Sequence, residues 1–304
     1  MRNFFAARMG RRPYIAGERL YLAMRDGSGD RLAALLTHAG QNDRPLVVLL
    51  HGLTGCETSM NMARAAACHL ARGYPVLRLN LRGAGPSRPT CRGDYHAGCS
   101  RDLADALTSL GEHEPALVAR GLLLSGVSLG ANAMIKFLAE YGGEFPIRAA
   151  VSVSAPIDLA LSCRSLMRRR NAPYHRWLLH RMKLDCQGSE MNGCARAALA
   201  QARTVYEFDD TYVAPRHGFT GAPEYYEKSK ALRYLYAVRV PTLLIHAHDD
   251  PWVPVAPYLG QDWSRNPALC MLLPRRGGHV GFHGRGHDVS WHDRCAAQFF
   301  SGFC

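Results

Sequence analysis

The stretch Gly121-Leu122-Leu123-Leu124-Ser125-Gly126-Val127-Ser128-Leu129-Gly130 decides the fold of this 304-residue chain. Its first half is an apolar run typical of a buried strand, and a helical segment from Ala131 to Tyr141 follows it. A Gly-x-Ser-x-Gly pentapeptide between strand and helix predicts a sharp turn, the nucleophile elbow, with Ser128 at its tip. Glycines two residues before and after the serine remove side chains that such a turn cannot accommodate. The alternative is a chance match in an ordinary loop, which the flanking strand and helix argue against.

A second buried strand, Pro45 to Leu50, runs into His51-Gly52-Leu53-Thr54-Gly55. The glycines allow the backbone to turn back over the serine and to point an amide inward. We expect the amides of Leu53 and Leu129 to form an oxyanion hole, a pair of rigid donors to a tetrahedral intermediate. We interpret His51 as a brace for this loop rather than as the catalytic base, because the base normally follows the acid in chain order.

A serine nucleophile needs a base and an orienting carboxylate. The strand Pro241 to Ala247 is followed by Asp249, Asp250 and, four residues after Asp250, Pro254. The end of a late strand is where the acid of such a triad belongs, and the spacing to Pro254 favours Asp250. Its neighbour Asp249 is expected to cap backbone groups or face solvent.

Three other aspartates could supply the carboxylate. Asp158 follows the strand Ala149 to Ser154 and is a second runner-up to Asp250, after Asp249. Asp209 and Asp210 also precede the last histidines, but they lie away from any predicted strand end.

The base is predicted to be His279. It follows the strand Leu269 to Leu273 and the pair Gly277-Gly278, which would let the loop fold over the serine. The chain order Ser128, Asp250, His279 is the order expected for the catalytic triad of an α/β-hydrolase.

Two further histidines on the same loop raise the question of a metal site. His283, His287 and Asp288 have the spacing His-x-x-x-His-Asp. No helical apolar pattern places them on one face, and three glycines (Gly281, Gly284 and Gly286) interrupt the segment. A solvated loop is therefore favoured over a zinc site, and neither a metal nor a cofactor is expected.

With these residues placed, the chain resembles the YheT-like α/β-hydrolases, a branch similar to the yeast medium-chain ethyl ester synthase/esterases. The resemblance covers about Leu46 to Phe282. It rests on the segments His51–Gly55, Asn80–Gly83, Tyr95–Leu103, Gly126–Gly130, Phe208-Asp209-Asp210, Ala214-Pro215, Gly218-Phe219, Tyr225-Tyr226, Asp250-Pro251 and Gly277–Phe282. Matched to these segments, the triad of the family falls on Ser128, Asp250 and His279.

Composition agrees with one globular α/β-hydrolase domain over residues 1–304. The chain is 47% hydrophobic and 20% charged, which excludes a disordered protein. Strands alternate with helical windows at Ser59–Arg72 and Ser100–Leu110, which predicts a mostly parallel central sheet with helices on both faces. Tyr14 to Thr37 is predicted to be an antiparallel hairpin at the sheet edge. Residues 157–236 interrupt the alternation and predict a helical cap inserted in the domain.

The cap and the overall charge bear on possible partners. Basic residues (Arg164, Arg168, Arg169, Arg170, Arg176, Arg181 and Lys183) alternate with apolar ones in the first half of the cap. Such a stretch is typical of a solvated helix face packed on a core, which we favour, or of a weak contact with an anionic membrane surface. The net charge is +12, but no nucleic-acid-binding motif accompanies it, so no nucleic acid is expected.

The ten cysteines include no Cys-x-x-Cys pair, and no run of 18 apolar residues exists. Residues 1–12 are basic without the apolar core of a secretory leader, so a cytoplasmic protein with reduced thiols is the simplest expectation.

The resemblance implies a serine esterase that cleaves an ester with an apolar acyl chain through an acyl-enzyme. An acyltransferase that uses the same triad is the alternative, and a non-enzymatic binding protein of the same fold is the third possibility.

Overall fold

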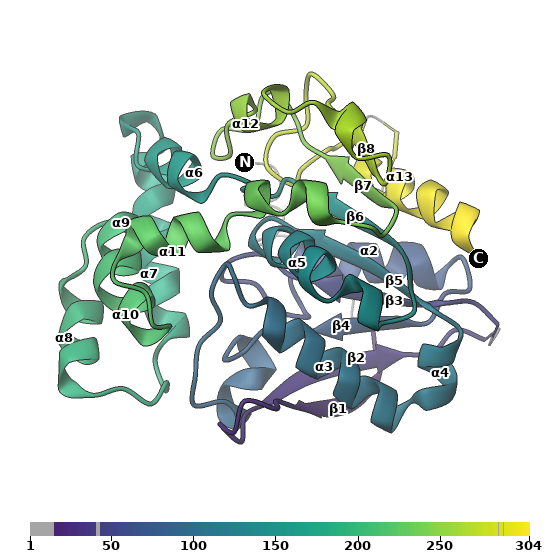
Figure 1. Ribbon diagram of the computed structural model, residues 1–304, viewed down its shortest axis with the longest axis horizontal. Helices are drawn as coiled ribbons and strands as arrows, with labels where there is room; N and C mark the ends of the chain where they lie inside the picture. Colours follow the sequence, from purple (N-terminus) through teal and green to yellow (C-terminus); the bar gives the residue numbers. More distant parts are fainter. Residues whose placement is uncertain (1–14, 41–42, 285, 288) are drawn as a thin grey trace.

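The computed structural model describes residues 15–40, 43–284, 286–287 and 289–304, and a mixed β-sheet forms its centre (Figure 1). Within these residues eight strands pair in the order β1-β2-β4-β3-β5-β6-β7-β8. Their bounds are β1 (Glu18–Ala23), β2 (Arg31–Thr37), β3 (Leu46–Leu50), β4 (Val76–Leu79), β5 (Leu122–Val127), β6 (Ile147–Val153), β7 (Thr242–Ile245) and β8 (Leu269–Leu272). Strand β2 is antiparallel to both of its neighbours, β1 and β4, and the remaining neighbours from β4 to β8 are parallel. The predicted mostly parallel sheet with an edge hairpin is confirmed, although Tyr14 lies outside the described residues.

Helices cover both faces of the sheet because side chains alternate along each strand. In β3, Val47 and Leu49 pack in one apolar cluster, with α2 (Met60–Leu70) and α13 (Trp291–Phe300). Leu46, Val48 and Leu50 belong to the other cluster, with α3 (Ser100–His113), α4 (Pro115–Ala119) and α5 (Leu129–Glu140). A five-residue strand buried on both faces is the pattern of a central parallel strand.

Strand β4 and helix α13 were not predicted from the sequence. β4 is only four residues long and includes Arg78, a residue type that is almost never buried. Here Arg78 is 2% exposed, and its guanidinium donates to the carbonyl of Ile15 at 2.6 Å. This backbone partner is 63 residues away, so it leaves no local sign in the sequence.

The segment between β6 and β7 holds most of the remaining helices, which we call the cap helices. They are α6 (Leu159–Leu166), α7 (Ala172–Asp185), α8 (Gly193–Gln201), α9 (Val205–Phe208), α10 (Ala214–Arg216) and α11 (Ala222–Ser229), with a π-helical turn, η4 (Asp209–Val213), between α9 and α10. They gather beside the sheet, to the left in Figure 1, and share an apolar cluster of their own. A further short helix, α12 (Ala256–Leu259), lies between β7 and β8.

Asp94, in the loop after β4, joins the body of the protein to three parts of the cap. Its Oδ1 accepts hydrogen bonds from Arg88 at 2.7 Å and from Ser189. Its Oδ2 accepts from the Tyr212 hydroxyl at 2.9 Å and lies 3.3 Å from the guanidinium of Arg216. A buried carboxylate with four partners holds the cap helices in one position over the body.

All ten cysteines fall within the described residues, and each is a free thiol. In the part of the chain that the structure describes, no helix has the length and apolarity needed to cross a bilayer.

A second charge network fixes the loop after β4 to the edge of the sheet. Arg82 pairs with Asp30 and Asp26 of the hairpin turn, both at 2.8 Å, and with Asp102 of α3 at 2.7 Å. The Arg82 side chain is only 9% exposed and that of Asp30 only 2%. This network therefore depends on one guanidinium to compensate three carboxylates.

We predict that Arg82→Met lowers the free energy of unfolding by about 3–5 kcal/mol, because it leaves buried carboxylates without their partner. Urea unfolding followed by circular dichroism measures this loss. The control is Arg92→Met, since the Arg92–Glu190 pair is solvent-exposed (77% and 71%) at 3.7 Å. Its removal is expected to change stability by less than about 1 kcal/mol. Equal effects of the two substitutions would contradict the assignment.

Candidate active site

Ser128 occupies the turn between β5 and α5 with strained backbone geometry. Its φ of 52° and ψ of −123° lie where non-glycine residues are rarely found. The neighbouring glycines are required by close backbone contacts. A Cβ on Gly126 would lie 2.8 Å from the Cα of Ala131, and one on Gly130 would lie 2.2 Å from the carbonyl oxygen of His51. The turn therefore has the geometry expected of the nucleophile elbow.

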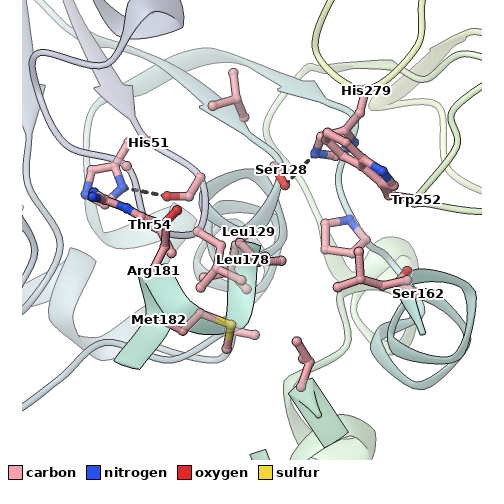
Figure 2. Close-up of a pocket in the computed structure, with 18 of the residues that line it drawn as sticks. His51, Thr54, Ser128, Leu129, Ser162, Leu178, Arg181, Met182, Trp252 and His279 are labelled. Atoms are coloured by element: carbon pink, nitrogen blue, oxygen red, sulfur yellow. Dashed lines mark hydrogen bonds between the residues drawn. The ribbon is translucent and has the colours of Figure 1, made fainter. Parts of the chain in front are cut away.

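Ser128, His279 and Asp250 form one chain of hydrogen bonds. The Nε2 of His279 lies 2.9 Å from the Ser128 Oγ, a hydrogen bond drawn as a dashed line in Figure 2, and its Nδ1 lies 2.8 Å from Asp250 Oδ2. The other carboxylate oxygen of Asp250 accepts from the amides of Trp252 and Val253 at 2.9 and 3.0 Å. Burial would raise the pKa of Asp250, but His279 and these amides outweigh it and hold the pKa below its usual value. Asp250 is therefore ionised at neutral pH and fixes the Nδ1 proton of His279 toward itself.

Asp249 holds the loop that carries His279. Its Oδ1 accepts from the amides of Gly277 and Gly278 at 2.7 and 2.8 Å. A Cβ on Gly277 would meet the Phe282 ring at 2.5 Å, so the loop folds tightly on itself. The expectation that Asp249 caps backbone groups is met, across 28 residues of chain.

Backbone strain is concentrated around these residues. Among the described residues, five that are not glycine have positive φ: Thr54, Ser128, Ser154, Val280 and Phe282. Ser154 supports the base directly, because its hydroxyl accepts from the amide of Val280, next to His279, at 3.2 Å. Unfavourable backbone angles persist only where surrounding contacts impose them, and they are typical of functional sites.

Leu53 and Leu129, whose amides are the predicted oxyanion donors, line the same pocket as Ser128. Leu129 is the first residue of α5, so its amide has no partner within the helix. Gly52, which precedes Leu53, lies so close to Ser128 that a Cβ on it would be 3.0 Å from the Cβ of Ser128. The next amide, of Thr54, donates to the buried hydroxyl of Tyr95 at 2.8 Å. This support from Tyr95 was not predicted, since only the fold brings the two loops together.

His51 braces the loop that precedes Leu53. Its Nδ1 lies 2.8 Å from the carbonyl oxygen of Gly52, and its Nε2 accepts from the amide of Leu81 at 3.0 Å. Burial lowers the pKa of His51 to about 4, so the ring is neutral at physiological pH. With both nitrogens engaged away from Ser128, His51 has the bracing position predicted for it.

The other candidate acids lie elsewhere. Asp158 caps α6, where its side chain accepts from the amide of Leu161 at 2.8 Å. Asp209 and Asp210 lie in η4 of the cap, away from His279. Neither hydrogen-bonds to His279, whose Nδ1 is paired with Asp250.

The loop that raised the question of a metal site is only partly described. His287 lies 3.2 Å from the guanidinium of Arg294, and Asp288 is outside the described residues. Among the residues with a described position, no group of three or more His, Cys, Asp or Glu side chains could hold a metal ion.

A cavity of about 670 Å³ opens above Ser128, between the sheet and the cap helices. Its wall is largely apolar, and Leu178 and Met182 of α7 lie across it from His279 and Trp252 (Figure 2). The Trp252 ring lies 4.9 Å from that of His279 and stacks at 3.5 Å on Tyr174 of α7. Trp252 therefore connects the base to the cap, a contact that no local sequence pattern indicated.

Comparison with known proteins agrees with this geometry. Residues 41–261 match the family described as "Serine aminopeptidase, S33". The YheT protein of Escherichia coli (strain K12) is 31% identical over 271 residues, which cover 86% of this chain and 78% of that protein. The Saccharomyces cerevisiae "Medium-chain fatty acid ethyl ester synthase/esterase 2" is 30% identical, over 86% of this chain and 63% of the yeast protein.

Solved structures show the same fold at lower identity. The Pyrococcus furiosus esterase Pf2001 superposes with a TM-score of 0.65 at 20% identity, over 97% of both chains. With the strand order, the strained serine turn and the family match taken together, the chain belongs to the α/β-hydrolases, in the branch that includes YheT.

Proposed function

We propose that this protein is a serine esterase that cleaves carboxylic esters through an acyl-enzyme. The observation that carries the proposal is the hydrogen-bonded chain Ser128–His279–Asp250 at the floor of a largely apolar cavity. The names of its relatives support the reaction class, since they include an ethyl ester synthase/esterase, a yeast "Monoacylglycerol lipase" and mammalian "Phospholipase ABHD3".

The chemistry follows from the positions of the groups. His279 Nε2 removes the proton of Ser128 Oγ as the oxygen attacks the ester carbonyl, and Asp250 stabilises the resulting imidazolium. The amides of Leu53 and Leu129 stabilise the negative charge on the former carbonyl oxygen. His279 then gives its proton to the leaving alcohol, and water, activated by the same base, releases the acid. An alcohol in place of water would give acyl transfer by the same steps.

The cavity favours substrates with an apolar acyl chain. A volume of about 670 Å³ is in the range of pockets that enclose a small organic ligand. Side chains from α6 and α7 form much of the wall, so we propose that the cap acts as the lid of the substrate site.

The first test of the proposal is the pair Ser128→Ala and His279→Ala. Each is expected to reduce kcat/KM for a nitrophenyl ester by several orders of magnitude, because the members of a triad act as a unit. Ser128→Ala should also abolish labelling by a fluorophosphonate. His283→Ala is the control, since His283 does not line the cavity, and its effect is expected to be small. Retained labelling of Ser128→Ala would contradict the proposal.

The identity of the acid is tested by three isosteric substitutions. Asp250→Asn is expected to lower kcat by about 10³–10⁴, because the amide cannot stabilise the imidazolium or fix the correct tautomer of His279. Asp249→Asn keeps an oxygen for the amides of Gly277 and Gly278 and should cost far less. Asp158→Asn should leave kcat nearly unchanged because Asp158 caps α6. A larger loss in Asp158→Asn than in Asp250→Asn would overturn the assignment.

We also propose that the basic surface of the cap associates weakly with anionic membranes. Six arginines are exposed along α6, α7 and the turn between them: Arg164, Arg168, Arg169, Arg170, Arg176 and Arg181. These helices also line the cavity, so the surface adjoins the substrate site. Attraction to anionic lipid contributes about 1 kcal/mol per basic residue near the surface.

Sedimentation with vesicles of phosphatidylserine and phosphatidylcholine tests this association. Binding is expected to decrease in Arg169→Glu/Arg170→Glu and at high salt, since screening shortens the reach of the charges. The double variant Arg101→Glu/Arg239→Glu has the same net charge change at exposed positions outside the cap helices and serves as the control. Equal loss in both variants would show that net charge alone is responsible.

A further inference from the structure

A buried carboxyl group stands on the cavity wall apart from the triad. Asp209 is the first residue of the π-helical turn η4 and is 9% exposed. Its Oδ2 accepts a hydrogen bond from the Tyr226 hydroxyl at 2.6 Å, and both residues line the cavity above Ser128. None of the proposed chemical steps uses either group.

The π turn separates Asp209 from its neighbour. Asp210 leaves the cavity wall, and its Oδ1 accepts from the amide of Ala222 at the start of α11, at 2.8 Å. Asp210 therefore has a structural role, whereas Asp209 is directed to the cavity. Insertions of one residue in a helix are rare and often occur at functional sites.

The surroundings of Asp209 are mostly apolar and provide few hydrogen-bond donors or positive charges for its carboxyl group. Phe208, Val213 and Tyr225 form the adjacent cavity wall. Among the described residues, no lysine or arginine pairs with the carboxyl group, and only Tyr226 donates to it. Burial raises the pKa of Asp209 to about 7, although the hydrogen bond from Tyr226 acts in the opposite direction.

A carboxyl group on this apolar wall is unfavourable for the fold. Burying one without full hydrogen bonding destabilises a fold, and Leu at this position would suit the apolar wall better. Asp209 lines the cavity, and no described side chain or backbone group donates a hydrogen bond to its Oδ1. A donor on a bound substrate would supply the missing partner.

We propose that Asp209, held by Tyr226, recognises a hydroxyl group on the substrate, at a distance from the ester that Ser128 attacks. The inference rests on the proposed esterase function and adds the substrate class: esters that carry a free hydroxyl in the alcohol part or in the acyl chain. Tyr226 is the positioning residue, because its hydroxyl fixes one carboxyl oxygen and leaves the other to the ligand.

A hydroxyl fits this site better than an ammonium group does. A hydroxyl both donates and accepts, so it pairs with a carboxylate or with a carboxylic acid. An ammonium group needs the ionised form, which burial in this wall disfavours.

The test compares matched esters that differ only by a hydroxyl and a methyl group. In the first pair the hydroxyl is in the alcohol part, as in hydroxyethyl octanoate and propyl octanoate. In the second it is in the acyl chain, as in methyl ω-hydroxyoctanoate and methyl nonanoate. The unmodified protein is expected to favour the hydroxylated member of one pair by at least about tenfold in kcat/KM, the effect of one hydrogen bond to a carboxylate. The pair that shows the preference identifies which part of the substrate reaches Asp209.

Substitutions then assign the preference to Asp209. Asp209→Leu is expected to reduce the ratio of the two kcat/KM values by about tenfold, toward one. Asp209→Leu/Tyr226→Phe removes both polar partners together, which avoids an unpaired hydroxyl, and should give the same ratio. Asp210→Asn is the matched control, and its ratio should equal that of the unmodified protein. Thermal unfolding of each variant verifies that it is folded.

The outcomes separate this inference from the proposed function. Hydrolysis of all four esters with no preference in either pair overturns the role of Asp209 and leaves the esterase assignment intact. A preference that survives Asp209→Leu, or one for aminoethyl octanoate over the hydroxyethyl ester, also overturns it. Absence of hydrolysis of any ester would overturn both proposals.

Discussion

The close approach of two backbones, at Gly130 and His51, is the contact on which the site depends. A Cβ on Gly130 would lie 2.2 Å from the carbonyl oxygen of His51, so only glycine permits it. This contact brings the start of α5 against the loop after β3. As a result the strained Ser128, the start of α5 and the loop with Leu53 border the same cavity. The serine and its proposed oxyanion donors are therefore positioned by backbone packing alone, which needs little rearrangement during a reaction.

The base and acid reach this point from two other loops, and the structure holds each from outside the triad. Asp249 and Ser154 fix the backbone on either side of His279. Trp252 packs on the His279 ring and on Tyr174 of the cap, so the position of the base and the position of the cap are linked. The cap is in turn fixed to the body through Asp94. A displacement of the cap would therefore alter the packing of Trp252 on His279, which would link the proposed lid to the catalytic base.

The sequence predicted those strands and site residues that have a recognisable pattern in the neighbouring sequence. The order of Ser128, Asp250 and His279 was predictable because each follows a recognisable strand, and parallel strands bring their carboxyl ends to one edge of the sheet. Asp209 and Tyr95 have partners far away in the chain, and nothing beside them in the sequence indicates those partners. β4 was missed for a similar reason, because Arg78 within it donates to the carbonyl of Ile15, which is distant in the sequence. Local patterns therefore predicted the other strands and the order of the proposed triad, whereas the contacts of Tyr95 and Asp209 depend on the tertiary structure.

The most direct measurement is the identity of the covalent intermediate. The protein is mixed with a nitrophenyl ester, quenched in acid within the first turnover and digested, and mass spectrometry locates the acyl group. The proposed mechanism predicts an acyl group on the peptide that contains Ser128, and its accumulation should precede release of the acid. The mechanism would be contradicted by an acyl group on another residue, or by hydrolysis at an undiminished rate in Ser128→Ala.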